Sequence, residues 1–200
     1  PDAVSAPGLA ARPQPDWQPI GPALAPVPAG TVHRVTWHIR DVVMPVAPGA
    51  TQTMWTFDGR VPGPVLHGRV GDTFEVTLVN RATTMTRSIT YHASKVAPNV
   101  TMRMIGPGSK FVYRFTATHS GIFMYHCGTP PVLQHIAMGM YGAVIIDPPN
   151  LPPVDHEYVF VQSELYRESD PSQPVDYNKL LAEQWDAVVF NGYVGQYTDR

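Results

Sequence analysis

The chain has 200 residues, of which only 15% are charged, and 14 Lys and Arg against 16 Asp and Glu leave a formal net charge of −2. This balance excludes a nucleic-acid-binding protein that works through a general excess of positive charge. No run approaches the ~20 apolar residues of a membrane-spanning helix, so we expect no membrane span in this segment. The 44% hydrophobic share suffices for a sizeable core, and the single cysteine excludes an internal disulfide.

The first change of pattern along the chain comes near residue 30. Residues 1–30 are rich in Pro, Ala and Gly without apolar periodicity, which is typical of an extended tether or surface strap. Beyond them, residues 70–79 and 110–115 alternate apolar and polar side chains, and residues 142–146 form a continuous apolar run. Gly, Pro, Asn and Asp separate such runs, which indicates an all-β sandwich or barrel. We assign it to residues 31–148; a β-rich part of an α+β fold is the alternative.

Residues 149–184 are expected to be a connection that contains Pro and Asp. Two elements are expected within it, a short strand at residues 157–162 and a helix at residues 177–185. Farther on, Phe190–Val194 (FNGYV) echoes Phe57–Val61 (FDGRV). This weak repeat predicts that residues 185–200 are the first strand of a second β domain, truncated at Arg200. Two unrelated strand-to-turn junctions would give the same letters.

The stretch from Gly121 to Met140 carries the most informative chemistry. Cys127, the only cysteine, is followed by His135 and then by Met140 within one expected strand–loop–strand passage. A thiolate, an imidazole and a thioether on one loop are the ligand types that favour copper in an electron-transfer site. Met138 is a competing thioether, and we rank Met140 higher. A buried, inert thiol is the alternative interpretation.

Strand geometry separates two neighbouring side chains of this stretch. If residues 122–127 are extended, His126 and Cys127 point to opposite faces, with Cys127 toward the interior. The same alternation in residues 87–92 places His92 on an outer face. The two imidazoles would form a pair if their strands are neighbours. Because two ligands leave a metal site incomplete, a third must come from another domain or chain.

Several short passages of the chain carry a family resemblance. They are residues 54–64 (MWTFDGRVPGP), 71–72 (GD), 78–80 (LVN), 91–93 (YHA), 125–127 (YHC) and 139–142 (GMYG). Over roughly residues 31–150 the chain resembles the first cupredoxin domain of copper-containing nitrite reductases and related two-domain multicopper oxidases. The resemblance implies two Greek-key β-sandwiches per chain, usually a homotrimer, and a periplasmic or otherwise exported location. It also implies nitrite or another small substrate and an electron-donor protein.

The resemblance further implies two kinds of copper site. Cys127, His135 and Met140 match type 1 copper ligands, and His92 and His126 match type 2 copper ligands. In the family, electrons pass from the type 1 copper through the Cys-His pair to the type 2 copper at a subunit interface, where nitrite becomes nitric oxide. The third type 2 histidine of the family lies in the second domain of the neighbouring subunit.

Two positions depart from the family pattern. The other type 1 histidine falls at Arg87, whose guanidinium has no lone pair for copper. The catalytic acid/base aspartate falls at Thr90, and a hydroxyl does not exchange protons near neutral pH as a carboxylate does. We therefore predict a type 1 site that is empty or weakened, and nitrite reduction that is slow or absent. Arg87 is expected either to reach the surface or to replace the positive charge of the metal.

Two other functions compete with the nitrite reductase-like one. A laccase-like trinuclear copper cluster needs several His-x-His pairs, and no two of the eight histidines are separated by a single residue. A mononuclear site therefore fits this chain better. The remaining alternative is a non-catalytic copper-binding or electron-transfer cupredoxin with degenerate metal sites.

Overall fold

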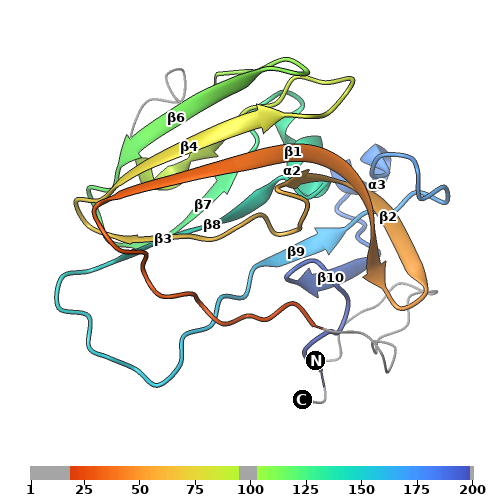
Figure 1. Cartoon of the computed structure of the whole chain (residues 1–200). Helices are drawn as coiled ribbons and strands as arrows, with labels where there is room; N and C mark the ends of the chain where they lie inside the picture. Colours follow the sequence, from red (N-terminus) through yellow and green to blue (C-terminus); the bar gives the residue numbers. More distant parts are fainter. Residues whose placement is uncertain (1–18, 95–102, 199–200) are drawn as a thin grey trace.

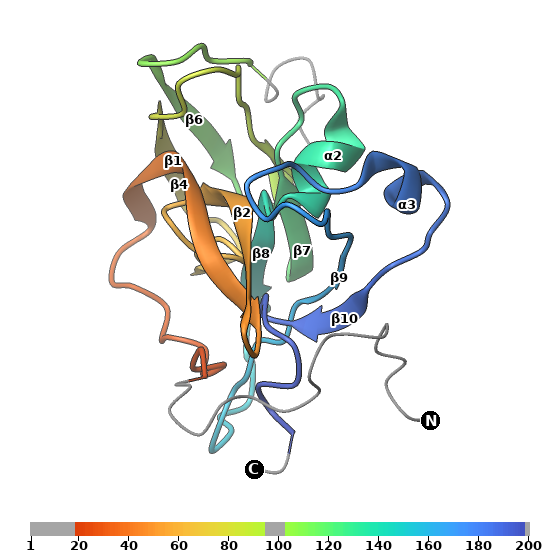
Figure 2. The ribbon, with the colours of Figure 1, turned by 90° about the vertical axis from the view of Figure 1, so that its right-hand side faces the viewer.

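Two four-stranded β-sheets form the main body of the computed structural model, which describes residues 19–94 and 103–198 (Figure 1). The first sheet has the order β2-β1-β4-β6, with β1 (Val32–Ala47), β2 (Ala50–Phe57), β4 (Thr73–Asn80) and β6 (Lys110–Thr116). The second has the order β3-β8-β7-β5, with β3 (Leu66–Arg69), β8 (Tyr141–Asp147), β7 (Gly121–His126) and β5 (Thr90–Tyr91). Figure 2 shows the two layers from the side. The predicted all-β sandwich is confirmed.

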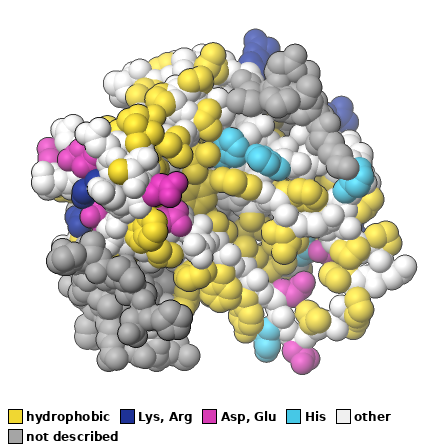
Figure 3. Space-filling view, turned by 180° about the vertical axis from the view of Figure 1, so that it is seen from behind, with side chains coloured by type: hydrophobic (Ala, Val, Ile, Leu, Met, Phe, Trp, Pro, Cys, Tyr) yellow, Lys and Arg dark blue, Asp and Glu magenta, His cyan; other side chains and the backbone are white. Residues whose placement is uncertain are grey.

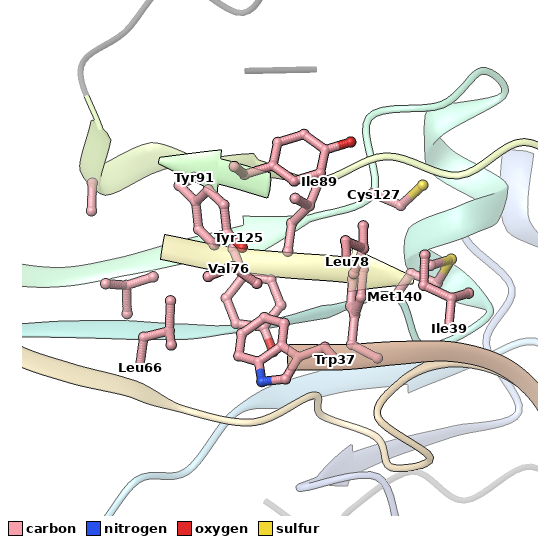
Figure 4. Packing of buried hydrophobic residues seen from close by; sticks show 14 of the residues in the cluster. Trp37, Ile39, Leu66, Val76, Leu78, Ile89, Tyr91, Tyr125, Cys127 and Met140 are labelled. Carbon is pink, nitrogen blue, oxygen red and sulfur yellow. The ribbon is translucent and has the colours of Figure 1, made fainter. Parts of the chain in front are cut away.

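The core between the sheets is centred on Tyr125 of β7. The centroid of its ring lies 5.2 Å from that of Trp37, 5.5 Å from that of Phe57 and 5.9 Å from that of Tyr91, with the rings inclined to one another. Such inclined contacts are favourable for aromatic rings. The Tyr125 hydroxyl donates a hydrogen bond of 2.8 Å to the carbonyl oxygen of Pro64. These contacts hold the end of β7 in place and so set the positions of the two residues that follow Tyr125 (Figure 4).

The passage between Cys127 and Met140 differs from the predicted strand–loop–strand, because it contains the helix α2 (Val132–Ala137). Two prolines precede the helix, and the fixed φ of proline suits a helix start. Gly139, with a φ of +107°, follows its end, in a conformation that side chains rarely allow. A helix of six residues is too short to show a helical period of apolar side chains, so the sequence pattern does not predict it. His135 therefore lies on a helix rather than in a loop.

A small antiparallel sheet of β9 (Gln162–Leu165) and β10 (Ala187–Phe190) packs beside the sandwich. The strand predicted at residues 157–162 is wrong in position, since β9 begins at Gln162. Tyr158 forms only an isolated bridge, with Ala23. Residues 157–159 instead form backbone hydrogen bonds with Pro22 and Leu24.

The helix predicted at residues 177–185 is shorter in the structure, where α3 spans Tyr177–Leu181. It starts as expected because the Asp176 side chain accepts hydrogen bonds from two backbone N–H groups of the first turn. Beyond its end, Glu183 has a positive φ of 54°, which breaks the helical path. The assignment of residues 185–200 to a second domain stays a prediction.

The predicted N-terminal extension is described only in part, since residues 1–18 lie outside the described residues. The backbone N–H of Leu24 donates to the Glu157 carbonyl oxygen at 2.9 Å, and that of Val159 donates to the Pro22 carbonyl oxygen at 2.7 Å. This part of the extension is therefore a strap along residues 157–159. Over the described part of the chain, neither helix has the length and apolarity to cross a membrane.

The close approach of β8 to Tyr125 generates a stability prediction. A Cβ at Gly142 would lie 2.4 Å from the Tyr125 ring, whose hydroxyl is held by Pro64. We expect Gly142→Ala to lower the free energy of unfolding by about 1–3 kcal/mol through overpacking. Gly106→Ala is the matched control, because nothing lies within 4 Å of a Cβ there. Denaturant unfolding that gives both variants the same stability would contradict this account of the core.

Candidate metal centre

Two imidazoles meet on the outer face of the second sheet. Strands β5 and β7 pair antiparallel with Thr90 opposite His126, and the 3₁₀ turn η1 (His92–Ser94) follows β5 directly. This arrangement brings the Nε2 atoms of His92 and His126 to 3.0 Å from each other. His92 is exposed and His126 is half-buried. The predicted outward pair of histidines is therefore present as a geometric feature.

The His126 ring is oriented by the backbone. Its Nδ1–H donates a hydrogen bond of 2.8 Å to the Cys127 carbonyl oxygen. A neutral imidazole that donates from Nδ1 carries a lone pair on Nε2, which is the atom that faces His92. Burial lowers the pKa of His126; the bond to the Cys127 carbonyl opposes this effect and the nearby His92 adds to it. His126 is therefore held as a neutral imidazole, the form that binds metals.

The two nitrogen atoms suit a single metal ion. Two nitrogens that each lie ~2.0–2.1 Å from one ion are roughly 2.9–3.4 Å apart for right-angled to tetrahedral geometry. The observed separation of 3.0 Å falls in this range. Within residues 19–94 and 103–198, no third His, Cys, Asp or Glu completes a metal-binding group with this pair. A site here needs at least one ligand from outside these residues.

Cys127 faces the opposite way, into the core. Its Sγ lies 3.1 Å from Nδ1 of His135, and both residues are buried. The backbone N–H of Cys127 donates to the Met140 carbonyl oxygen at 3.0 Å, and that of Met140 donates to the His135 carbonyl oxygen at 3.1 Å. Figure 4 shows the sulfur atoms of Cys127 and Met140 at the same end of the core. The three predicted type 1 residues therefore lie together; their role as ligands stays a prediction.

Met138 has a separate environment. It is buried, but its Sδ accepts a hydrogen bond of 3.2 Å from the backbone N–H of Val175. Its sulfur is thus engaged by the segment that leads to α3. This contact favours Met140 over Met138 as the thioether of the Cys127 cluster.

Arg87 lies inside the protein with 0% of its surface exposed, so the expectation that it reaches the surface is excluded. Its guanidinium carbon is 4.3 Å from the ring centroid of Trp55, whose ring centroid lies 4.9 Å from that of His135. One terminal nitrogen donates to the Asp41 carboxylate at 3.3 Å, and the other donates to the Met85 sulfur at 3.0 Å. The charge is therefore held within the core.

The donor set around Cys127 does not fit a type 1 copper. Three candidate ligands are present. The position expected for the fourth ligand, a histidine, carries Arg87, whose guanidinium has no lone pair and repels a cation. Burial and then the charge of Arg87 lower the pKa of His135 to about 4, so its imidazole is neutral at neutral pH. The Cys127–His135 contact is thus one between polar groups in the core, beside a resident cation.

The sequence did not predict three partners of Arg87, which are Asp41, Trp55 and Met85. Asp41 and Trp55 are Cα partners across β1 and β2, so their side chains share a face of the first sheet. No motif or spacing marks such a pair before the strand register is known. A second omission is Ser88, whose hydroxyl accepts a hydrogen bond from the backbone N–H of Gly128 at 3.1 Å and holds the loop after Cys127.

An apolar cleft of about 510 Å³ lies on the outer face of β7 and β8, between these strands, α2 and residues 159–164. Ile122 is 80% exposed beside it, and Leu133 and Phe160 are exposed as well. Outward side chains of β7 continue from Ile122 to His126, so the cleft and the histidine pair share one face. Figure 3, which views the molecule from behind, shows histidine side chains beside a broad apolar surface.

Known proteins share this fold and these sequence features. Residues 38–151 match a family model described as multicopper oxidase. The copper-containing nitrite reductase of Neisseria meningitidis serogroup A is 37% identical over 169 residues, which cover 81% of this chain and 44% of that protein. That of Pseudomonas chlororaphis is 34% identical over 173 residues, 75% of this chain and 48% of the relative. The chain thus spans about half the length of these curated relatives.

A solved structure, the copper nitrite reductase from Nitrosomonas europaea, matches with a TM-score of 0.73 and 40% identity, over 81% of this chain and 57% of that one. The family match over residues 38–151 includes strands of both sheets. Because a family model covers more than half of the residues and the strands form the corresponding fold, the chain belongs to the multicopper oxidase family.

Proposed function

We propose that this chain is part of a copper-dependent oxidoreductase in which His92 and His126 contribute to a mononuclear type 2 copper site that reduces nitrite to nitric oxide. The observation that carries the proposal is the convergence of two imidazole nitrogens, 3.0 Å apart, on an outer face. Relatives named copper-containing nitrite reductases support nitrite as the substrate. When bound there, copper would supply Lewis-acid and one-electron chemistry.

The reaction takes one electron and two protons for each nitrite and releases nitric oxide and water. Thr90 lies directly opposite His126 in the β5–β7 pair, so its side chain is on the face of the imidazoles. A hydroxyl orients an anion by donating a hydrogen bond, but it does not deliver a proton near neutral pH. We therefore propose that nitrite turnover is slow, with protons supplied by water.

The electron comes, in this proposal, from an exported electron-donor protein in the periplasm or a comparable compartment. The Cys127 cluster has no assigned step, because its donor set does not fit a type 1 copper. This misfit supports a second candidate, a non-catalytic copper-binding or electron-transfer protein. Copper content and nitrite turnover separate the two: copper at the histidine pair with turnover supports the enzyme, and copper without turnover supports the second candidate.

We also propose a homotrimer in which a neighbouring subunit covers the apolar cleft and supplies the third ligand. The exposed apolar residues of β7 beside His126 support this arrangement. Contiguous apolar surface next to polar groups is typical of a protein interface. Within the described residues no third ligand accompanies the histidine pair, so a subunit that covers this face could supply it.

Copper binding tests the histidine pair. His92→Asn and His126→Asn should each weaken Cu(II) binding at least tenfold, because either change removes one of two nitrogen ligands. His156→Asn is the control, since His156 is exposed and its ring contacts Tyr158, away from the pair. Competitive titration with a chelator of known affinity measures the change. Unaltered affinity in both site variants would refute the assignment.

The proton supply can be restored at Thr90. We expect Thr90→Asp to raise the rate of nitric oxide formation at least tenfold, because a positioned carboxylate adds general acid catalysis. Thr90→Asn is the matched control, which keeps the size of Asp without a titratable proton. Rates are measured with a small-molecule reductant at equal copper content. If Asp and Asn give the same rate, Thr90 is not the position that limits protonation.

Assembly should depend on the apolar face of β7. Ile122→Glu introduces a charge at the most exposed residue of this face. The variant should have a lower mass by light scattering, and it should bind less copper per chain. Val43→Glu is the control, because Val43 is 65% exposed but lies on β1 of the other sheet. A mass unchanged in both variants would place any subunit contact elsewhere.

A further inference from the structure

The guanidinium of Arg87 is enclosed by three kinds of group that favour a cation. The face of the Trp55 ring lies 4.3 Å from its carbon, which is the geometry of a cation–π contact. The Asp41 carboxylate and the Met85 sulfur accept its terminal N–H groups at 3.3 and 3.0 Å. An aromatic face, a carboxylate and a thioether together form a site built for a positive charge.

The backbone directs Arg87 into this site. Its N–H and carbonyl groups exchange hydrogen bonds of 3.0 and 2.7 Å with those of Ile105. Ile89 and Tyr91, which share its side of the extended segment, are fully buried. Arg87 therefore points into the core for the same reason that its apolar neighbours do, and leaving the core would require breaking this pairing.

The charge lies beside the predicted type 1 residues. Arg87 and His135 both contact Trp55: the guanidinium carbon lies 4.3 Å from the Trp55 ring centroid, and the Trp55 and His135 ring centroids lie 4.9 Å apart in an edge-on contact. His135 in turn contacts the Cys127 thiol at 3.1 Å. Cys127 is fully buried, so an incoming ion would meet a closed core and a fixed cation.

We propose that Arg87 is a built-in replacement for the type 1 copper ion: its guanidinium supplies the positive charge of the pocket, and Cys127, His135 and Met140 stay metal-free. The proposal is independent of nitrite turnover. It confines copper bound by this domain to the outer pair, His92 and His126.

Visible spectroscopy of the purified protein tests the proposal, because a Cu(II)–thiolate bond gives intense visible absorption and Cu(II)–imidazole bonds do not. The parent protein loaded with Cu(II) should show no such band that depends on Cys127, as judged against Cys127→Ser. Arg87→His should gain the band and one further copper per chain, and Arg87→His with Cys127→Ser should lose both. A Cys127-dependent band in the parent would overturn the proposal.

A second variant guards against misfolding of Arg87→His. Arg87→Ala leaves space where the guanidinium lay, so added imidazole should enter and allow the Cu(II)–thiolate band to form. If neither Arg87→His nor imidazole-treated Arg87→Ala yields the band while circular dichroism shows native strands, the pocket is not a copper site blocked by Arg87, and the proposal is wrong.

A thermal double-mutant cycle tests whether Asp41 acts through this cation. Asp41→Asn should lower the melting temperature of the parent, because it removes the only carboxylate at the Arg87 guanidinium among the described contacts. In an Arg87→Leu background the same change should have little effect. Equal destabilisation in both backgrounds would show that Asp41 does not hold the charge, which contradicts the built cation site.

Discussion

The alternation of side chains at the end of β7 governs the chemistry of this domain. Tyr125 is held between the sheets by Trp37 and Phe57, and the extended backbone then sends His126 outward and Cys127 inward. The Cys127 carbonyl oxygen also accepts the Nδ1–H of His126. One short strand end therefore positions residues of two separate sites, and a change in its register would disturb both.

The two sites have different physical characters. The outer one consists of two imidazole nitrogens on an exposed face and lacks a ligand within the described residues, so it has the chemistry of an incomplete metal site. The inner one is closed and already contains a cation, with a carboxylate and an aromatic face to hold it. In our proposal, copper therefore binds only at the outer site, away from the Cys127 thiol.

Much of this arrangement could be predicted from the sequence, because strand alternation is a local property. The runs at residues 110–115 and 142–146 are β6 and β8, and the opposite directions of His126 and Cys127 follow from a period of two. The sequence predicts that His92 and His126 meet only if their strands are neighbours, and the structure does pair β5 with β7. These features required only the pattern of side chains within single strands.

The remaining features depend on contacts between distant segments. Helix α2 is too short to show a periodicity, and the register of β9 is set by its pairing with β10 rather than by its own letters. The environment of Arg87 requires Asp41 and Trp55 to be partners across β1 and β2, which no local pattern reveals. The sequence therefore marks Arg87 as unusual but does not show whether its side chain points to the surface or into the core.

X-ray absorption at the copper edge, on purified protein loaded with one equivalent of copper, tests the division between the two sites most directly. The account predicts a ligand shell of nitrogen and oxygen atoms without sulfur, altered when His126 is replaced. A copper–sulfur shell, or a spectrum indifferent to the loss of that imidazole, would contradict it.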